Sequence, residues 1–228
     1  MQQARFKLRK WKTSDAEVMR HINKCEGNET DGLTEEMVNV NKDKSKVLGI
    51  IWDEEKDCLE IEMDKMANEC SSRSQSVTKR SILSSLAKLF DPLGIVSPVA
   101  LIAKLLFQQL CQDGVGWDDE LPKEKTDSWE EWIKDLKQVK GISIPRCLHN
   151  PGDGNAKYTL HGFGDASTKA YCAVIYLVCE TPTTRYSRLI CSKTRVAPLK
   201  SLTIPRLELM SARILATLME TVRNALSS

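Results

Sequence analysis

The most constraining feature of this sequence is a nearly unbroken apolar run at residues 170–178, Ala-Tyr-Cys-Ala-Val-Ile-Tyr-Leu-Val. Such a run is typical of a strand that is covered on both faces of a sheet. Two further strand candidates flank it, at residues 157–163 and 187–193. The turn-forming cluster at residues 150–155, Asn-Pro-Gly-Asp-Gly-Asn, precedes all three and marks a boundary. The C-terminal third is therefore predicted to form a sheet, followed by an amphipathic helix over about residues 205–226.

The middle of the chain has a helical pattern. Residues 67–77 are small and polar, and mark a linker. Thr78 is expected to cap the first helix, which the Asp91-Pro-Leu-Gly94 turn ends. Ser97 is expected to cap a second helix that runs to about Cys111, with proline in its first turn. A third amphipathic helix is predicted after the turn at Pro122. The tryptophans at positions 117, 129 and 132 are predicted to belong to the core.

The N-terminal part reads mainly as short strands and loops. Residues 13–45 predict a loop with one short helix. Residues 47–52 and 59–63 predict two strands around a turn at residues 53–57. Residues 5–12, Arg-Phe-Lys-Leu-Arg-Lys-Trp-Lys, alternate basic with apolar side chains, which suits a strand with one cationic face.

That basic segment is a candidate for contact with nucleic acid. The net charge of the chain is only 33 − 31 = +2, so such contact would have to come from a local cluster. The alternative is an ordinary edge strand with a solvated, lysine-rich face. The candidate phosphate-binding residues are Lys7, Arg9, Lys10 and Lys12.

Two carboxylates are the candidates for catalysis. Asp165 follows a predicted strand, and Glu208 lies in the first turn of the last predicted helix. Carboxylates at a strand end and on a nearby helix can converge on a hard divalent cation, Mg²⁺ or Mn²⁺, which activates water in phosphodiester cleavage. The alternative is purely structural, because Asp-Ala-Ser is common in turns and a glutamate in the first turn complements the helix dipole.

The eight cysteines contain no close pair of the kind that zinc sites and redox motifs use. Free thiols in a reducing compartment are the simplest interpretation, and the chain opens with no secretory signal. The longest apolar-rich stretch, residues 95–111, is interrupted by polar residues and is not expected to span a membrane. An intracellular location and no membrane partner are therefore expected.

Seven motifs, in order along nearly the whole chain, resemble the Pol region of Pao/BEL-type long-terminal-repeat retrotransposons. They are Phe6-Lys-Leu-Arg-Lys-Trp11, Val47-Leu-Gly-Ile-Ile-Trp52, Thr78-Lys-Arg-Ser-Ile-Leu83, Leu89-Phe-Asp-Pro-Leu-Gly-Ile-Val-Ser-Pro98, Leu160-His-Gly-Phe-Gly-Asp-Ala-Ser167, Ser192-Lys-Thr-Arg-Val-Ala-Pro198 and Leu202-Thr-Ile-Pro-Arg-Leu-Glu-Leu209.

The resemblance implies an α+β fold in three parts. Residues 1–66 are expected to be the end of a reverse-transcriptase palm, with the basic segment in the primer-gripping region. Residues 78–150 are expected to be the helical thumb and connection, and residues 156–228 the N-terminal half of a ribonuclease H-like fold. In that family Asp165 and Glu208 would bind the metal, and the polyprotein would act on a primer-template or an RNA–DNA hybrid. The polyprotein would do so in the cytoplasm, in virus-like particles or in the nucleus.

The departures from the family pattern predict that the chain is inactive alone. The polymerase's paired aspartates are expected upstream of Met1, and the remaining ribonuclease H acids beyond Ser228. The family segment also carries the label of a Pao retrotransposon peptidase, so an aspartic peptidase is one alternative. Against it, that mechanism needs aspartates in Asp-Thr-Gly or Asp-Ser-Gly turns, and neither tripeptide occurs. A non-catalytic, nucleic-acid-binding relic is the other alternative.

Overall fold

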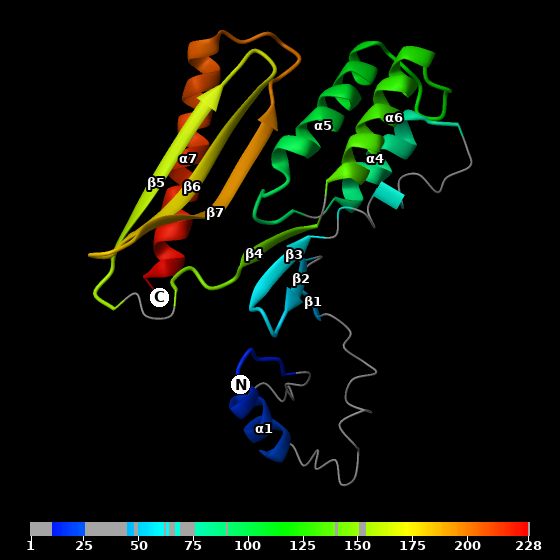
Figure 1. Cartoon of the computed structure of the whole chain (residues 1–228). Helices are drawn as coiled ribbons and strands as arrows, with labels where there is room; N and C mark the ends of the chain where they lie inside the picture. The colour runs from blue at the N-terminus through cyan, green and yellow to red at the C-terminus, as the bar shows by residue number, and fades with distance from the viewer. Residues whose placement is uncertain are drawn as a thin grey trace, which may run out of the picture. The chain divides into compact units, whose positions relative to one another are not determined.

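The computed structural model describes residues 11–25, 45–47, 50–61, 63, 67–68, 76–89, 91–139, 141–150 and 154–227. The chain divides into two compact units, and Figure 1 labels their helices and strands. The first unit comprises Met1–Ile61 with Ser143–Cys147, and the second comprises Glu62–Ile142 with Leu148–Ser228.

The first unit contains a short helix and a small sheet. Helix α1 (Ala16–Cys25) confirms the helix expected within residues 13–45. Strands β1 (Ser45–Val47), β2 (Ile50–Asp53), β3 (Cys58–Ile61) and β4 (Ile142–Pro145) form a sheet in the order β1-β2-β3-β4. The predicted pair of strands is confirmed as β2 and β3. Strand β4 was not predicted, because its short Ile-Ser-Ile-Pro pattern gives little signal and its pairing partner lies far away in sequence.

The turn between β2 and β3 is held by charged and aromatic side chains. Asp57 has a positive φ of 49°. Its carboxylate accepts two hydrogen bonds from the Arg146 guanidinium, at 2.6 and 3.0 Å, and one from Trp52 Nε1 at 3.0 Å. The Arg146 guanidinium also lies 5.2 Å from the centre of the Trp52 ring. This bidentate pair joins the segment after β4 to the β2–β3 turn.

The second unit begins with three helices, α4 (Lys79–Lys88), α5 (Ser97–Gln112) and α6 (Lys123–Gln138). Helix α5 packs against both α4 and α6. Trp129 and Trp132 on α6 are buried and stacked, with ring centroids 4.8 Å apart, as the sequence predicted. Trp117 contradicts the prediction, because it is 48% exposed and packs under the Lys79 ammonium, 4.8 Å from its ring centre.

The helix starts follow local capping chemistry, with one correction. Thr78 caps α4 as predicted, in a reciprocal capping box with Ser81. Ser97, however, is the first helical residue of α5 and makes no capping hydrogen bond, since the N-cap is Val96. The carboxylate of Asp91 takes over that task and accepts hydrogen bonds from the backbone N–H groups of Ile95 and Val96, both at 2.8 Å.

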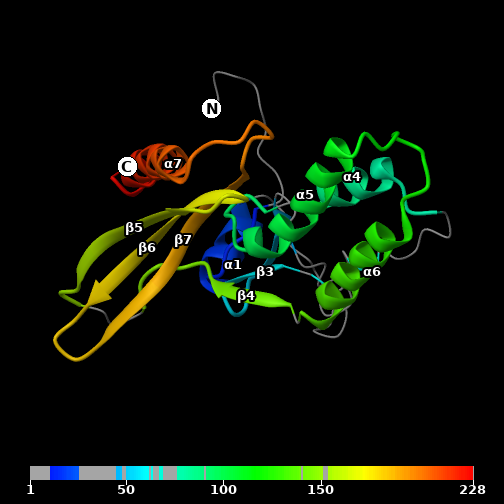
Figure 2. The same cartoon turned by 90° about the horizontal axis from the view of Figure 1, so that it is seen from above.

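The second part of this unit is an antiparallel sheet in the order β5-β6-β7, with one long helix on one face (Figures 1 and 2). The strands are β5 (Lys157–Ala166), β6 (Ala170–Glu180) and β7 (Arg185–Val196), and the helix is α7 (Ile204–Leu226). All three predicted strands and the final helix are confirmed, although each strand extends beyond its predicted bounds. The mixed α and β character is likewise confirmed, whereas the assignment to palm and thumb stays a prediction.

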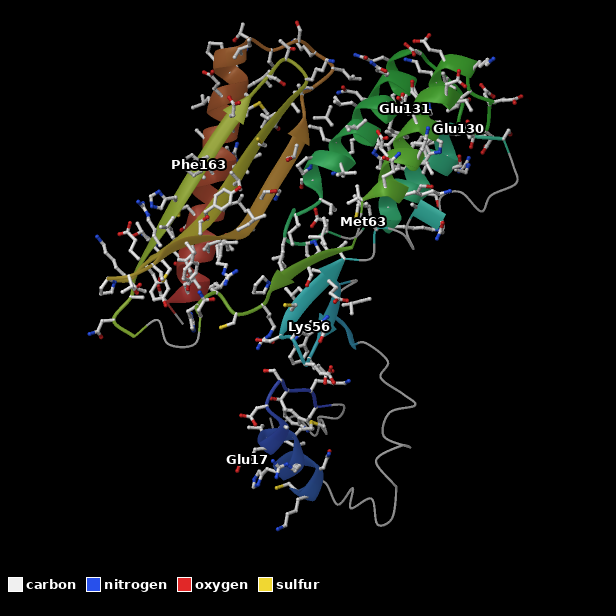
Figure 3. The ribbon with its side chains drawn as sticks, viewed as in Figure 1. Glu17, Lys56, Met63, Glu130, Glu131 and Phe163 are labelled. Atoms are coloured by element: carbon white, nitrogen blue, oxygen red, sulfur yellow. The ribbon has the colours of Figure 1, made fainter. Side chains whose placement is uncertain are left out.

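The two faces of β6 are covered differently. Alternate residues from Tyr171 to Cys179 are buried, while the residues between them are only half-buried. The buried set faces α7, since Tyr171 packs with Leu207 of that helix. On the opposite face the ring of Phe163 is 57% exposed and meets Tyr176 edge-on (Figure 3). Among the described residues the predicted cover is therefore complete on the α7 face and only partial on the other face. An apolar run indicates that burial is favourable but does not show which element covers each face.

The turn before α5 contacts β7 closely. Gly94 has a positive φ of 75°, and a side chain on it would overlap the backbone carbonyl of Ser192. Ser192 in return donates its N–H to the Leu93 carbonyl at 2.8 Å and its hydroxyl to the Gly94 carbonyl at 2.6 Å. Glycine at this position thus permits the helical segment to dock on the sheet.

Two further expectations concern the described residues. None of their helices combines the length and apolar character needed to cross a membrane. All seven cysteines among them are free, in keeping with the sequence interpretation.

Candidate functional site

Two alternate glycines on β5 let α7 lie directly on that strand. A Cβ built on Gly162 would come within 2.7 Å of Leu215 and 2.8 Å of Met219. A Cβ built on Gly164 would lie 2.5 Å from the hydroxyl of Ser211. Larger residues at either glycine would push the helix away. Gly162 and Gly164, just before Asp165, therefore form the part of β5 on which α7 packs.

Ser211 is the polar contact between α7 and the sheet. It is 1% exposed, and its hydroxyl donates a 2.5 Å hydrogen bond to the backbone carbonyl of Cys172. Cys172 is the register partner of Asp165 on the neighbouring strand. The hydrogen bond thus fixes α7 beside the strand position that carries the candidate aspartate.

Glu208 lies on the flank of α7 that faces β5. Helical spacing puts Glu208, Ser211, Leu215 and Met219 on one stripe, and the last three meet the β5 glycines. Gly164 is next to Ser211, and Gly162 is next to Leu215 and Met219, so helix and strand run in opposite directions. Glu208 is three residues before Ser211, or about 4.5 Å along the axis. At about 3.3 Å per strand residue, this puts Glu208 level with Asp165 and Ala166.

The two carboxylates approach from different faces of β5. Gly162, Gly164 and Ala166 face α7, so alternation points the Asp165 side chain to the opposite face. Strand β5 has β6 on one side only in the described sheet, so its other edge is open there. Asp165 and Glu208 are both exposed, and a metal ion shared by them would have to lie at that edge. One oxygen of Asp165 already accepts a hydrogen bond of 2.8 Å from the N–H of Ala166.

The donor set at this edge fits one hard cation better than two. Mg²⁺ is commonly held by one or two carboxylates together with water and substrate phosphate, and this pair offers three carboxylate oxygens beyond the one used by Ala166. No group of three or more His, Cys, Asp or Glu side chains suited to a metal ion is present among the described residues.

The predicted basic cluster is described only at its end. Lys12 forms an ion pair with Glu54, with 2.7 Å between Nζ and Oε1. Lys7, Arg9 and Lys10 lie outside the described residues. The sequence interpretation also missed the positioning role of Gly162, Gly164 and Ser211, although the alternate glycines before Asp165 were a visible signal of close backbone approach.

Comparison with known families gives one match. Residues 78–228 match the family described as Pao retrotransposon-like RNaseH-like domain. This match takes in helices α4–α6 as well as the sheet and helix that carry Asp165 and Glu208. No curated protein matches the chain.

Proposed function

Because the chain belongs to the Pao retrotransposon RNaseH-like family, and so represents a segment of a retrotransposon Pol polyprotein, we propose that it takes part in degrading the RNA strand of RNA–DNA hybrids. The observation that supports the proposal is the packing of α7 on the two β5 glycines, from which we infer that Glu208 is level with Asp165 along β5. In this proposal the two residues hold Mg²⁺ or Mn²⁺ as oxygen ligands.

A divalent ion at this edge would stabilise negative charge on a bound phosphodiester and lower the pKa of a water molecule. The protein's own part is to hold the carboxylates of Asp165 on β5 and Glu208 on α7 level with each other. The buried Ser211 hydrogen bond and the two glycines set that level. Because a two-metal site needs more ligands than one pair of carboxylates supplies, we propose that the chain is inactive alone and depends on further acids of the polyprotein.

The remaining parts carry a finer proposal. Residues 1–66 are proposed to be the end of a reverse-transcriptase palm, and residues 78–150 its thumb and connection. Lys7, Arg9, Lys10 and Lys12 would then contact the phosphates of a primer-template. The ion pair of Lys12 with Glu54 has to open or be shared if that lysine is to serve, since its ammonium is already partnered.

Metal binding is the first test. Manganese should broaden the NMR signals of residues near the edge of β5, and calorimetry should detect one weak site. Asp165→Asn with Glu208→Gln should abolish both effects, since neutral amides are poor ligands for these ions. The control is Glu130→Gln with Glu131→Gln on α6 (Figure 3), which removes the same charge from exposed positions elsewhere. An equal response from both double variants would exclude the proposed ligands.

Hydrolysis is the second test. The 228-residue chain should not cleave a labelled RNA–DNA hybrid with Mn²⁺. A version extended by about 80 residues of its own reading frame, enough to complete a small domain, should cleave it and lose the activity on Asp165→Asn. Casein is assayed in parallel at acid pH, because its cleavage by the unextended chain would favour the peptidase instead. A longer chain that binds Mn²⁺ but leaves the hybrid intact would contradict the proposed reaction.

A further inference from the structure

A groove of about 350 Å³ opens between α7 and β7, on the flank of the helix opposite Glu208. It lies within the second unit, and residues of β6, β7 and α7 line it. The lining residues are Tyr171, Lys193, Arg195, Met210, Arg213 and Ile214, with Thr217 and Leu218 at one side.

The sheet register explains why cations reach this groove. Lys193 and Arg195 are two apart on β7, so their side chains leave the same face of the strand. Their register partners on β6 are Ala173 and Tyr171, which are buried on the α7 face. Arg213 comes from α7 itself. Three positive charges from two elements therefore surround one groove.

Nothing acidic among the lining residues balances these charges. Lys193, Arg195 and Arg213 are exposed, and no ion pair or hydrogen bond joins their charged groups to another residue of the described ranges. By contrast, Arg185 at the far end of β7 pairs with Glu180 at 3.0 Å. Because the whole chain carries a net charge of only +2, the groove is a local concentration of positive charge. Like charges held together in this way attract an anionic ligand.

The charge and the size of the groove point to a small anionic ligand. Arginine offers a planar fork that matches the oxygens of a phosphate or a carboxylate, two of the three cations are arginines, and phosphate is the anion that the proposed substrate carries. A volume of about 350 Å³ is at the lower end of small-ligand sites, so it suits a phosphate with its sugar better than a docked helix. The half-buried apolar side chains of Met210, Ile214 and Leu218 line the rest of the groove.

The groove lies at the same level of the sheet as the candidate site, on the other side of α7. Tyr171, which lines it, is the register partner of Ala166, the neighbour of Asp165. Strands β5 and β7 are separated by two strand spacings, or about 10 Å. We propose that the groove holds a backbone phosphate of a nucleic-acid strand and is a second anchor for the hybrid, one helix width from the carboxylates. This inference rests on the proposed function, because it takes the same hybrid as the substrate.

The test is binding of a fluorescein-labelled RNA–DNA hybrid to the full chain in EDTA, followed by anisotropy over a range of salt concentrations. Changing Lys193, Arg195 and Arg213 together to glutamine should weaken binding at least about tenfold. It should also reduce the slope of log affinity against log salt by about 0.9 for each phosphate that the protein no longer neutralises. The matched control is Lys123, Lys134 and Lys137 to glutamine, which removes the same charge from exposed positions on α6. The control should leave the slope within error.

Each other outcome has a defined meaning. Wild-type chain that does not bind the hybrid, or a groove variant with unchanged affinity and slope, overturns the inference. A glutamate-rich peptide that competes for the groove better than pyrophosphate overturns it in favour of a protein partner. Circular dichroism checks the fold, and the single change Arg213→Gln gives a milder variant should the triple change unfold. Groove-dependent binding without cleavage by the extended chain would leave this inference standing and refute only the hydrolytic function.

Discussion

Gly164→Ala should destabilise the second unit, and Ser211→Ala should abolish that effect. In the wild type the new methyl group would lie 2.5 Å from the Ser211 hydroxyl. That hydroxyl is buried and donates to the Cys172 carbonyl, so it cannot move aside without losing its hydrogen bond. The next nearest atoms are 3.6 and 3.7 Å from the added carbon, which is ordinary contact. The clash therefore depends on a single oxygen atom.

The expected magnitude follows from three contributions. Overpacking a tight contact costs about 1–3 kcal/mol. The buried hydrogen bond that is strained or broken is worth about 1 kcal/mol. Replacing glycine by alanine returns about 0.4–1 kcal/mol, because the unfolded chain is less flexible. The net cost of Gly164→Ala is thus about 1–3.6 kcal/mol, a fall in melting temperature of about 2–14 °C for a domain of this size class.

The assay is urea and thermal unfolding of the wild type, both single variants and the double variant. Ser211→Ala alone should cost about 1 kcal/mol through the missing hydrogen bond. In that background Gly164→Ala should be neutral or stabilising by up to about 1 kcal/mol, since the remaining contacts are ordinary. The two changes should therefore be coupled by more than about 1 kcal/mol, as expected for residues in direct contact.

If Gly164→Ala costs as much in the Ser211→Ala background as in the wild type, or costs nothing in the wild type, Ser211 is not the atom that resists the added methyl group. The same four proteins also report on function. If the contact sets the level of Glu208 beside Asp165, Mn²⁺ affinity should fall in Gly164→Ala and recover in the double variant.

Two further predictions concern other contacts. The Arg146 hydrogen bonds keep the pKa of the Asp57 carboxyl below its ordinary value, so this pair stabilises the fold above the ordinary pKa and ceases to do so as pH falls through the lowered one. Asparagine tolerates the same positive φ, so Asp57→Asn should lower the free energy of unfolding by less than about 1 kcal/mol at pH 7, because the ion pair is partly exposed and screened. If the stability of the variant falls as steeply in acid as that of the wild type, the Asp57–Arg146 pair is not the cause of the acid dependence. In Gly94→Ala the alanine would have to adopt a left-handed φ, and its methyl group would overlap the Ser192 carbonyl. The variant should therefore lose more than about 2 kcal/mol of unfolding free energy in chemical denaturation. A loss below about 0.5 kcal/mol, roughly that of a neutral surface change, would show that the turn can move away from β7 without cost.

Local chemistry accounts for what could be predicted from the sequence. The cap at Thr78, the helical stripes and the three long strands depend on neighbours within a few residues, and each was predicted. The predicted cap of α5 was wrong, because a residue further back along the chain accepts the hydrogen bonds at the start of that helix. Asp91 satisfies the N–H groups at the start of α5 that Ser97 was expected to cap. In sequence both residues are plausible caps, and only the path of the turn selects one.

Coverage of the sheet was beyond the sequence pattern. The apolar run at residues 170–178 correctly indicated a central strand, and β6 does lie between β5 and β7. Hydrophobicity reports how favourable burial would be, but not which element supplies the cover. The sequence therefore did not show that the face carrying Phe163 and Tyr176 would be only partly covered. Strand β4 illustrates the same limit, since its pairing with β3 depends on a chain segment some eighty residues away.

The candidate site divides in the same way. The sequence predicted that Asp165 lies at the end of a strand and Glu208 on a helix, which the structure confirms, while their role as metal ligands stays a prediction. Their common level along β5 follows only from Gly164 and Ser211, which are distant in sequence and adjacent in the fold. The basic groove is wholly a product of tertiary structure, because Arg213 meets Lys193 and Arg195 only where α7 crosses back over the sheet. The sequence gives the type of each residue. The distance between two charges that are far apart in the sequence depends on how the intervening chain folds and packs.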